Sequence, residues 1–151
     1  MILYLDASAL VKRYIQERGS ENVNAWIDEA EMVTTGLISR VEVAAAIARA
    51  GRNQLITFEE AFAALRQFRA EWENYQRLPI SENTVARGDT LAYEYHLRGY
   101  DATHLACALI WQETIGLPVT LATFDRQLIE AAKTVKMAYL SEEESAGLKL
   151  E

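Results

Sequence analysis

The sequence predicts an α/β fold, a three-layer α/β/α sandwich built on a mostly parallel sheet of five strands. Five short runs rich in β-branched residues or leucine punctuate the chain, and longer segments with helical periodicity separate them. Strands that alternate with helices in this way build a sheet that is covered on both faces. The five runs are Ile2 to Leu5, Met32 to Thr35, Leu78 to Ile80, Val119 to Ala122 and Met137 to Leu140.

The segments between these runs carry residues typical of helix ends. Serine and aspartate favour the start of a helix because their side chains accept hydrogen bonds from its first N–H groups, and glycine favours the end. We expect helices to end at Gly19, Gly51 and Gly99, and to begin at Ser20, Ser81, Asp101 and Asp125.

One of these helical segments carries an aromatic stripe. Its large apolar residues recur at helical spacing, which indicates a face packed on the core or a helical arm. If part of the stripe is exposed, a protein interface is expected there. The stripe consists of Phe58, Phe62, Leu65, Phe68, Trp72 and Tyr75.

The length of 151 residues suits one domain, and the chain contains no internal repeat and no Gly/Ser linker. We therefore expect a single domain over residues 1–151, with a solvated acidic tail over 141–151. No window approaches the roughly 18 apolar residues of a membrane helix, so no membrane association is expected. The N-terminus lacks a basic stretch before its apolar run and is interpreted as a first strand, not a signal peptide.

Cys107 is the one cysteine in the sequence, so no intramolecular disulfide can form. It lies in the apolar run L-A-C-A-L-I, which favours a buried structural thiol. A reducing cytoplasm suits such a residue.

The formal net charge of −7 argues against simple nucleic-acid binding, which usually shows a basic footprint. Bound divalent cations would offset part of this charge at a carboxylate site. The basic residues are mostly arginine, which is well suited to phosphate. The charge therefore weakens a nucleic-acid interpretation without excluding it.

Three of the five aspartates stand where a helix is expected to begin. Asp6 follows the first strand, Asp125 follows the fourth, and Asp101 follows a glycine turn. Loops at the carboxyl ends of parallel strands surround the ligand crevice of an open α/β sheet, so these side chains can meet there if their strands are neighbours. Helix capping explains each aspartate equally well when it is taken alone.

Glu42 is a fourth candidate, on the alanine-rich helix from 38 to 50. Its setting, R-V-E-V-A-A-A-I, is unusually apolar and small. Periodicity places Glu42 either on an exposed stripe or at the edge of a cleft, and it does not choose between them.

Carboxylates that meet at one site indicate a hard divalent cation. Mg²⁺ and Mn²⁺ prefer carboxylate oxygens and water, and such ions lower the pKa of a bound water and stabilise a departing oxygen. Without metal the acids repel one another. We therefore expect a Mg²⁺ or Mn²⁺ dependence.

Four segments of the chain, in this order, resemble the PIN-domain ribonucleases, and most closely the VapC-like toxins of toxin–antitoxin pairs. They are L-Y-L-D-A-S-A-L-V-K, I-S-R-V-E-V-A-A-A-I, Y-D-A-T-H-L-A-C-A and L-A-T-F-D-R-Q-L. The resemblance covers nearly the whole chain. It implies a parallel five-stranded sheet with acids gathered at one end.

The resemblance also implies roles for individual residues. Asp6, Glu42, Asp101 and Asp125 match the family's metal-binding catalytic acids. Ser8 and Thr123 match hydroxyl positions near the site, although helix capping and turn formation also account for them. His104 matches a common helix position beside Asp101, and we interpret it as structural and not as a general base.

The resemblance further implies an RNA substrate, a small antitoxin partner whose helix or arm fills a groove, and a homodimer. The acidic charge is the main departure from that pattern.

The residues differ from those expected in two other classes of α/β protein. A receiver domain would show paired acids after the first strand and a lysine after the last long strand, whereas Asp6 stands alone and Arg126 follows Asp125. A haloacid-dehalogenase phosphatase would carry a second aspartate at the position of Ser8. A non-catalytic module that binds a divalent metal at its strand ends remains the alternative, although intact acids at all four positions count against it.

Overall fold

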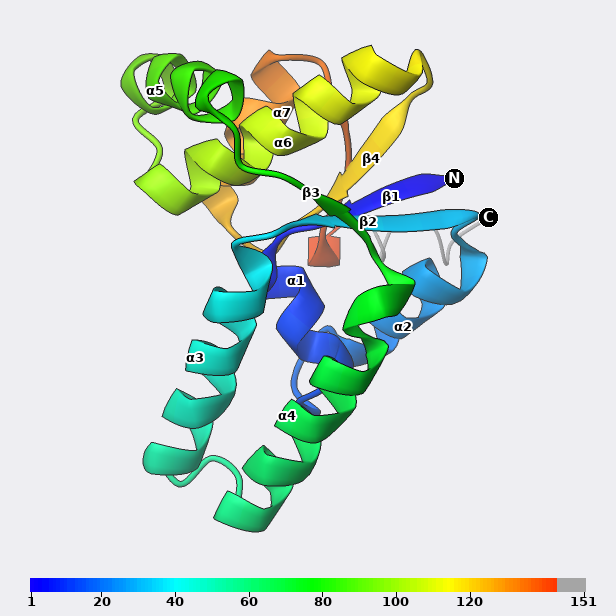
Figure 1. Cartoon of the computed structure of the whole chain (residues 1–151), viewed down its shortest axis with the longest axis vertical. Coiled ribbons are helices and arrows are strands. Elements are labelled where there is room, and N and C mark those ends of the chain that lie inside the picture. Colours follow the sequence, from blue (N-terminus) through cyan, green and yellow to red (C-terminus); the bar gives the residue numbers. More distant parts are fainter. Residues whose placement is uncertain (144–151) are drawn as a thin grey trace.

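The computed structural model describes residues 1–143, in which five strands form one parallel sheet. Their order across the sheet is β3–β2–β1–β4–β5 (Figure 1). The predicted α/β class with a five-stranded parallel sheet is confirmed. The strands are β1 (Ile2–Leu5), β2 (Met32–Gly36), β3 (Gln76–Leu78), β4 (Val119–Ala122) and β5 (Ala138–Leu140).

Helices cover both faces of the sheet (Figure 1). One face carries α1 (Ala7–Leu10) with a 3₁₀ turn at Val11–Arg13, α2 (Ser20–Glu29), α3 (Ser39–Arg52) and α4 (Phe58–Glu71), which a second 3₁₀ turn follows at Trp72–Asn74. The other face carries α5 (Glu82–Tyr95), α6 (Gly99–Ile115) and α7 (Arg126–Thr134). Among residues 1–143, no helix combines the length and the hydropathy needed to cross a membrane.

The strand order reverses direction between β1 and β4. The chain moves outward from β1 through β2 to β3, then crosses back to β4 and continues to β5 on the far side. Because parallel crossovers are right-handed, this reversal sends the helices of the two halves to opposite faces. It also leaves a crevice at the carboxyl ends of β1 and β4, whose last residues, Leu5 and Ala122, are paired in register.

Successive residues of the central strand point into two separate cores. Leu3 and Leu5 pack with α1 to α4, whereas Tyr4 packs with α5, α6 and α7. All three side chains are fully buried. This two-sided burial follows from the period-two geometry of a strand, and it explains why β1 is apolar throughout.

The third strand lies two residues earlier than predicted. We expected it over Leu78 to Ile80, but it spans Gln76–Leu78. Pro79 cannot donate to a strand ladder, and β3 is an edge strand whose Gln76 and Arg77 are exposed. The apolar run therefore marked the end of the strand and not its middle.

Three helix ends also differ from prediction. The first helical segment stops at the 3₁₀ turn that ends at Arg13, before Gly19. The helix capped by Ser81 ends at Tyr95, because His96 adopts a left-handed conformation with φ of 55° and its N–H bonds the carbonyl of Ala92. The next helix begins at Gly99 and not at Asp101.

Helices α3 and α4 form a hairpin that projects away from the sheet (Figure 1). A capping box between Thr57 and Glu60 begins α4. The aromatic stripe divides along this arm: Phe68 and Trp72 are buried near the sheet, whereas Phe58 and Phe62 are 77% and 64% exposed. The stripe is therefore partly core and partly an exposed apolar surface.

The predicted acidic tail lies mostly outside the described residues, which end at 143. Within them, Ser141 is buried and the Glu142 carboxylate pairs with Arg18, so the first residues after β5 contact the domain. Cys107 is a buried free thiol, as predicted, and burial raises its pKa to about 11.

Candidate functional site

The four predicted acids meet in one pocket at the carboxyl ends of β1 and β4. Asp6, Glu42, Asp101 and Asp125 all line this pocket of about 300 Å³, which we call the acid pocket. Asp6 directly follows β1, and Asp125 lies three residues after the end of β4. Asp101 and Glu42 come from the first turns of α6 and α3. The strand adjacency on which the prediction depended is present.

Asp6 caps a helix and faces the acid pocket at the same time. Its Oδ1 accepts hydrogen bonds from the Ala9 N–H at 2.9 Å and the Ser8 hydroxyl at 2.7 Å. Its Oδ2 accepts from the Thr123 hydroxyl at 2.5 Å. Burial raises the pKa of Asp6 above its ordinary value, although these hydrogen bonds act in the opposite direction. Ser8 and Thr123 therefore hold the two oxygens of this carboxylate in place.

Asp125 also combines the two roles. Its Oδ1 accepts from the Leu128 N–H at 2.9 Å and begins α7, which leaves Oδ2 toward the acid pocket. Asp6 and Asp125 can each cap a helix with one carboxylate oxygen and face the acid pocket with the other, because a carboxylate has two oxygens.

Asp101 is not a helix cap. Arg98 holds the N-cap position of α6 in an extended conformation, so Asp101 lies inside the first turn, with its carboxylate free of capping. Burial raises the pKa of Asp101, and the nearby charge of Asp125 raises it further against the lowering effect of Arg98. A buried carboxylate without a capping role is a stronger site candidate than a capping one.

Arg98 is a site residue that sequence reasoning missed. Its Nε donates to Asp101 Oδ2 at 2.8 Å, and its Nη2 donates to Asp125 Oδ2 at 3.0 Å. The hydrogen bond to Asp101 raises the pKa of the guanidinium further, so Arg98 stays charged. The cation therefore relieves the repulsion between two acids. The available indication was its position three residues before Asp101, across one helical turn.

His104 ties the acid pocket to the core. Its Nε2 lies 2.6 Å from Glu42 Oε1, and its Nδ1 lies 2.8 Å from the Tyr4 hydroxyl. Burial raises the pKa of Tyr4 well above its ordinary value, so the phenol keeps its proton. Its hydroxyl then donates a hydrogen bond to Nδ1. Nε2–H then donates to the Glu42 carboxylate, which can only accept. The structural interpretation of His104 agrees with its 1% exposure.

The acids retain oxygen lone pairs for a cation. Asp101 Oδ1 and Glu42 Oε2 accept no hydrogen bond from any residue in 1–143, and Asp6 Oδ2 and Asp125 Oδ2 accept one each. Within the same residues, no three acids or histidines are arranged to hold an ion by protein atoms alone. Mg²⁺ usually keeps several waters and uses one or two carboxylates, so the donor set would suit a partly hydrated hard cation.

A family model described as the PIN domain matches residues 3–134, which is most of the chain. The chain belongs to the PIN-domain family. This PIN domain is 34% identical over 128 residues to Ribonuclease VapC45 of Mycobacterium tuberculosis, a match that covers 84% of this chain and 86% of the relative. The resemblance expected from the sequence is confirmed.

Solved structures with lower identity support the same fold. FitAcB from Neisseria gonorrhoeae superimposes with a TM-score of 0.67 at 18% identity, covering 93% of this PIN domain and 98% of that chain. A toxin–antitoxin complex from Klebsiella pneumoniae superimposes with a TM-score of 0.53, also at 18% identity, covering 80% and 84% of the two chains.

Proposed function

We propose that this PIN domain is a metal-dependent endoribonuclease and the toxin of a toxin–antitoxin pair. The observation that carries the proposal is the convergence of four carboxylates in one pocket of a chain that is 34% identical to a named ribonuclease. The reaction is hydrolysis of RNA phosphodiester bonds at the acid pocket. We take residues 1–151 to act as one domain.

Mg²⁺ or Mn²⁺ is the proposed cofactor, held by Asp6, Asp101 and Asp125 with Glu42 at the edge. When bound, the ion supplies a water of lowered pKa and stabilises the oxygen that departs. The chain's own residues fix the ligands: Thr123 holds one oxygen of Asp6, and His104 holds one oxygen of Glu42. Both nitrogens of His104 are engaged, so it is not available to take a proton from the attacking water.

An antitoxin and a second copy of the chain are the proposed protein partners. The arm formed by α3 and α4 exposes Leu55, Phe58 and Phe62, which supply apolar area for such contacts. We place the protein in the cytoplasm, where the free thiol of Cys107 suits a reducing compartment.

RNA cleavage by the purified protein tests the proposal. We expect cleavage of single-stranded RNA with Mg²⁺ or Mn²⁺ and none with EDTA. Asp6→Asn and Asp101→Asn should each lower the rate by about 100-fold or more, since even residues that only orient metal ligands contribute 10- to 100-fold. Asp89→Asn, an exposed aspartate on α5, is the charge-matched control and should cleave normally.

Three outcomes would contradict the proposal. Cleavage that persists in EDTA would remove the metal from the mechanism. Full activity in Asp101→Asn would remove the acid pocket. A protein that binds Mn²⁺ but cleaves no RNA would leave the non-catalytic metal-binding module as the better interpretation.

A further inference from the structure

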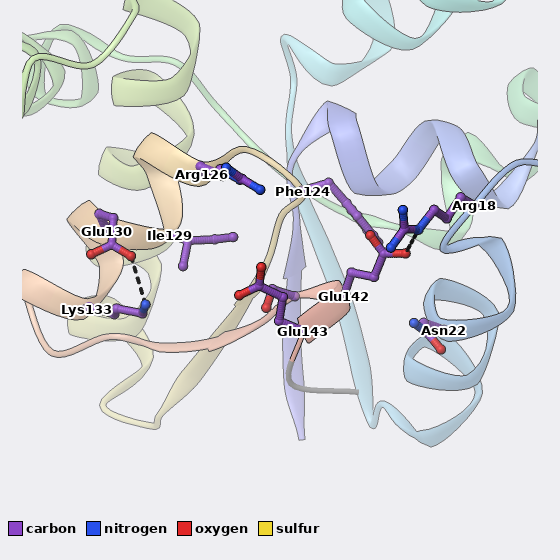
Figure 2. Close-up of a pocket in the computed structure, with 10 residues that line it drawn as sticks. Arg18, Asn22, Phe124, Arg126, Ile129, Glu130, Lys133, Glu142 and Glu143 are labelled. Atoms are coloured by element: carbon purple, nitrogen blue, oxygen red, sulfur yellow. Dashed lines mark hydrogen bonds and ion pairs between the residues drawn. The ribbon is translucent and has the colours of Figure 1, made fainter. Parts of the chain in front are cut away.

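A groove of about 1030 Å³ adjoins the acid pocket, and Phe124 lines both. Its cations come from two sides: Arg126 and Lys133 belong to α7, and Arg18 precedes α2 (Figure 2). Arg126 directly follows Asp125 in the chain, so the backbone of one cation lies a single residue from the acid pocket. Three acids, Glu130, Glu142 and Glu143, line the groove as well and balance these cations, and we call the feature the basic groove after its cations.

Arg126 is the cation in the basic groove that lacks a compensating charge. Lys133 pairs with Glu130 at 2.8 Å, and Arg18 pairs with Glu142. The exposed Arg126 side chain makes no hydrogen bond or ion pair with any residue in 1–143. An unpaired guanidinium beside a carboxylate pocket is placed to receive an anion.

The groove already holds an anionic group of the chain itself. The Glu142 carboxylate accepts a hydrogen bond from Arg18 Nε, and Glu143 lines the same groove (Figure 2). Both glutamates follow β5, which ends at Leu140. Guanidinium groups bind carboxylate and phosphate oxygens with the same geometry, so Glu142 occupies a position that suits a phosphodiester.

The wall between the two sites is closely packed. The Phe124 ring packs against Trp26 with centroids 6.0 Å apart, and Lys12 Nζ lies 4.5 Å from its centre. A Cβ at Gly19, where φ is +91°, would lie 2.5 Å from the ring, so only glycine allows this approach. The ring therefore lies between the acids and the groove cations with contacts on its own side chain.

We propose that the basic groove binds the phosphodiester backbone of the RNA strand beside the cleavage position, and that Glu142 and Glu143 compete with RNA for it. The proposal takes its substrate from the proposed function. It accounts for RNA binding by a chain of net charge −7, because the cations are placed beside the acid pocket and the competing acids lie on a terminal segment.

RNA binding measured in EDTA tests the groove apart from catalysis. The probe is a fluorescein-labelled single-stranded RNA of about a dozen nucleotides, followed by fluorescence anisotropy at several salt concentrations. Arg126→Ala and Arg18→Ala should each weaken binding by about 3- to 10-fold and reduce the salt slope by about 0.7, the value for one lost phosphate contact. Arg66→Ala, an exposed arginine on the α3–α4 arm, is the control and should bind as wild type.

The competing acids are tested with a variant that keeps their size. Glu142→Gln with Glu143→Gln should bind RNA about 3- to 10-fold more tightly, because the anion that occupies the groove is removed. The control Glu73→Gln with Glu94→Gln removes the same charge at exposed positions outside the groove. Equal gains in the two double variants would show a general charge effect and would contradict the competition.

The outcomes separate this inference from the proposed function. Normal RNA cleavage together with wild-type affinity and salt slope in Arg126→Ala and Arg18→Ala would overturn the groove and leave the nuclease intact. Weakened binding in these variants, in a protein that cleaves no RNA with any metal, would overturn the nuclease and leave an RNA-binding groove.

Discussion

The acid pocket and the basic groove share one wall, but they are built from different kinds of side chain. In the acid pocket, Asp6 and Glu42 are held by Thr123 and His104, which are themselves buried. In the basic groove, Arg126 is exposed and unpaired within the described chain. Metal ligands need fixed orientation, whereas a flexible cation can follow a variable strand. The two proposed sites therefore differ in how their side chains are held. The acid pocket holds its carboxylates in fixed orientations for chemistry, whereas the basic groove leaves Arg126 able to adapt to the strand it recognises.

The largest effect is expected from the loss of His104, which supports Glu42 in the acid pocket. His104→Ala should lower the free energy of unfolding by about 2–4 kcal/mol, because it opens a cavity and leaves the Tyr4 hydroxyl and the Glu42 carboxylate without their partner. Arg126→Ala should change it by less than about 0.5 kcal/mol, as is usual for an exposed side chain. Urea denaturation measures both values. Similar losses in the two variants would erase the contrast between the sites.

Thr123→Val tests the orientation of Asp6 with little change in volume. It removes the donor to Asp6 Oδ2 and the acceptor of the Asp125 N–H. We expect the rate of RNA cleavage to fall by about 10- to 100-fold, as for other groups that orient a metal ligand, and Thr123→Ser to restore most of it. A fall in melting temperature without a fall in rate would limit Thr123 to a structural role.

Arg98→Met tests the acid pocket through its affinity for Mn²⁺. Arg98 is bonded to one oxygen each of Asp101 and Asp125, so a cation that binds these carboxylates would compete with it. The side chain is 72% exposed, and two pairs of roughly 0.2–1 kcal/mol each imply Mn²⁺ affinity about 2- to 30-fold tighter. Arg49 lines the same pocket without a bonded partner in residues 1–143, so Arg49→Met is the control for charge alone. Equal shifts in the two variants, measured by Mn²⁺ titration, would exclude displacement.

The smallest expected effect is the pH dependence of the metal-free protein. Burial raises the pKa of Asp6 and of Asp101 in the folded state. Below these raised pKa values and above about 3.9, the ordinary aspartate value, the folded state binds more protons than the unfolded state. Stability from these two groups therefore increases as the pH falls through the raised pKa values toward the ordinary aspartate value.

Asp6→Asn isolates one of these contributions. In EDTA, its gain in melting temperature as the pH is lowered should be smaller than that of wild type, by about 2–4 °C for each 1 kcal/mol that the raised pKa contributes in a chain of this size. Asp89→Asn and the groove variant Arg126→Ala should keep the wild-type gain. An unchanged gain in Asp6→Asn would contradict the raised pKa.

The sequence predicted the strands of the sheet from local patterns, whereas the meeting of the acids was predicted only if β1 and β4 are neighbours, and Glu42 was included through the family resemblance. Apolar runs mark β1 and β4 even without knowledge of their neighbours, since strands buried on both faces contain little else. The edge strand β3 was misplaced, because Gln76 and Arg77 face solvent and lack that pattern. Edge strands are paired on one side only. Their sequences therefore show a weaker apolar pattern than those of central strands.

The interactions across the site could not be predicted from the sequence. The pairing of His104 with Glu42 joins residues 62 positions apart, and its existence depends on how α3 and α6 pack. Arg98 lies beside Asp101 in sequence, yet its bond to Asp125 follows from the position of α7. Local rules identified the acids, whereas their partners are set by tertiary packing.

The adjacency of β1 and β4 has a consequence for synthesis of the chain. Asp6 is synthesised before its partner Thr123, which follows 117 residues later. β4 must then pair with β1 before Asp6 or Thr123 can face Asp125. Long-range parallel pairing is the slow part of such folding. A nascent chain therefore carries no assembled acid pocket until β4 and the residues that follow it, Thr123 and Asp125, have been made.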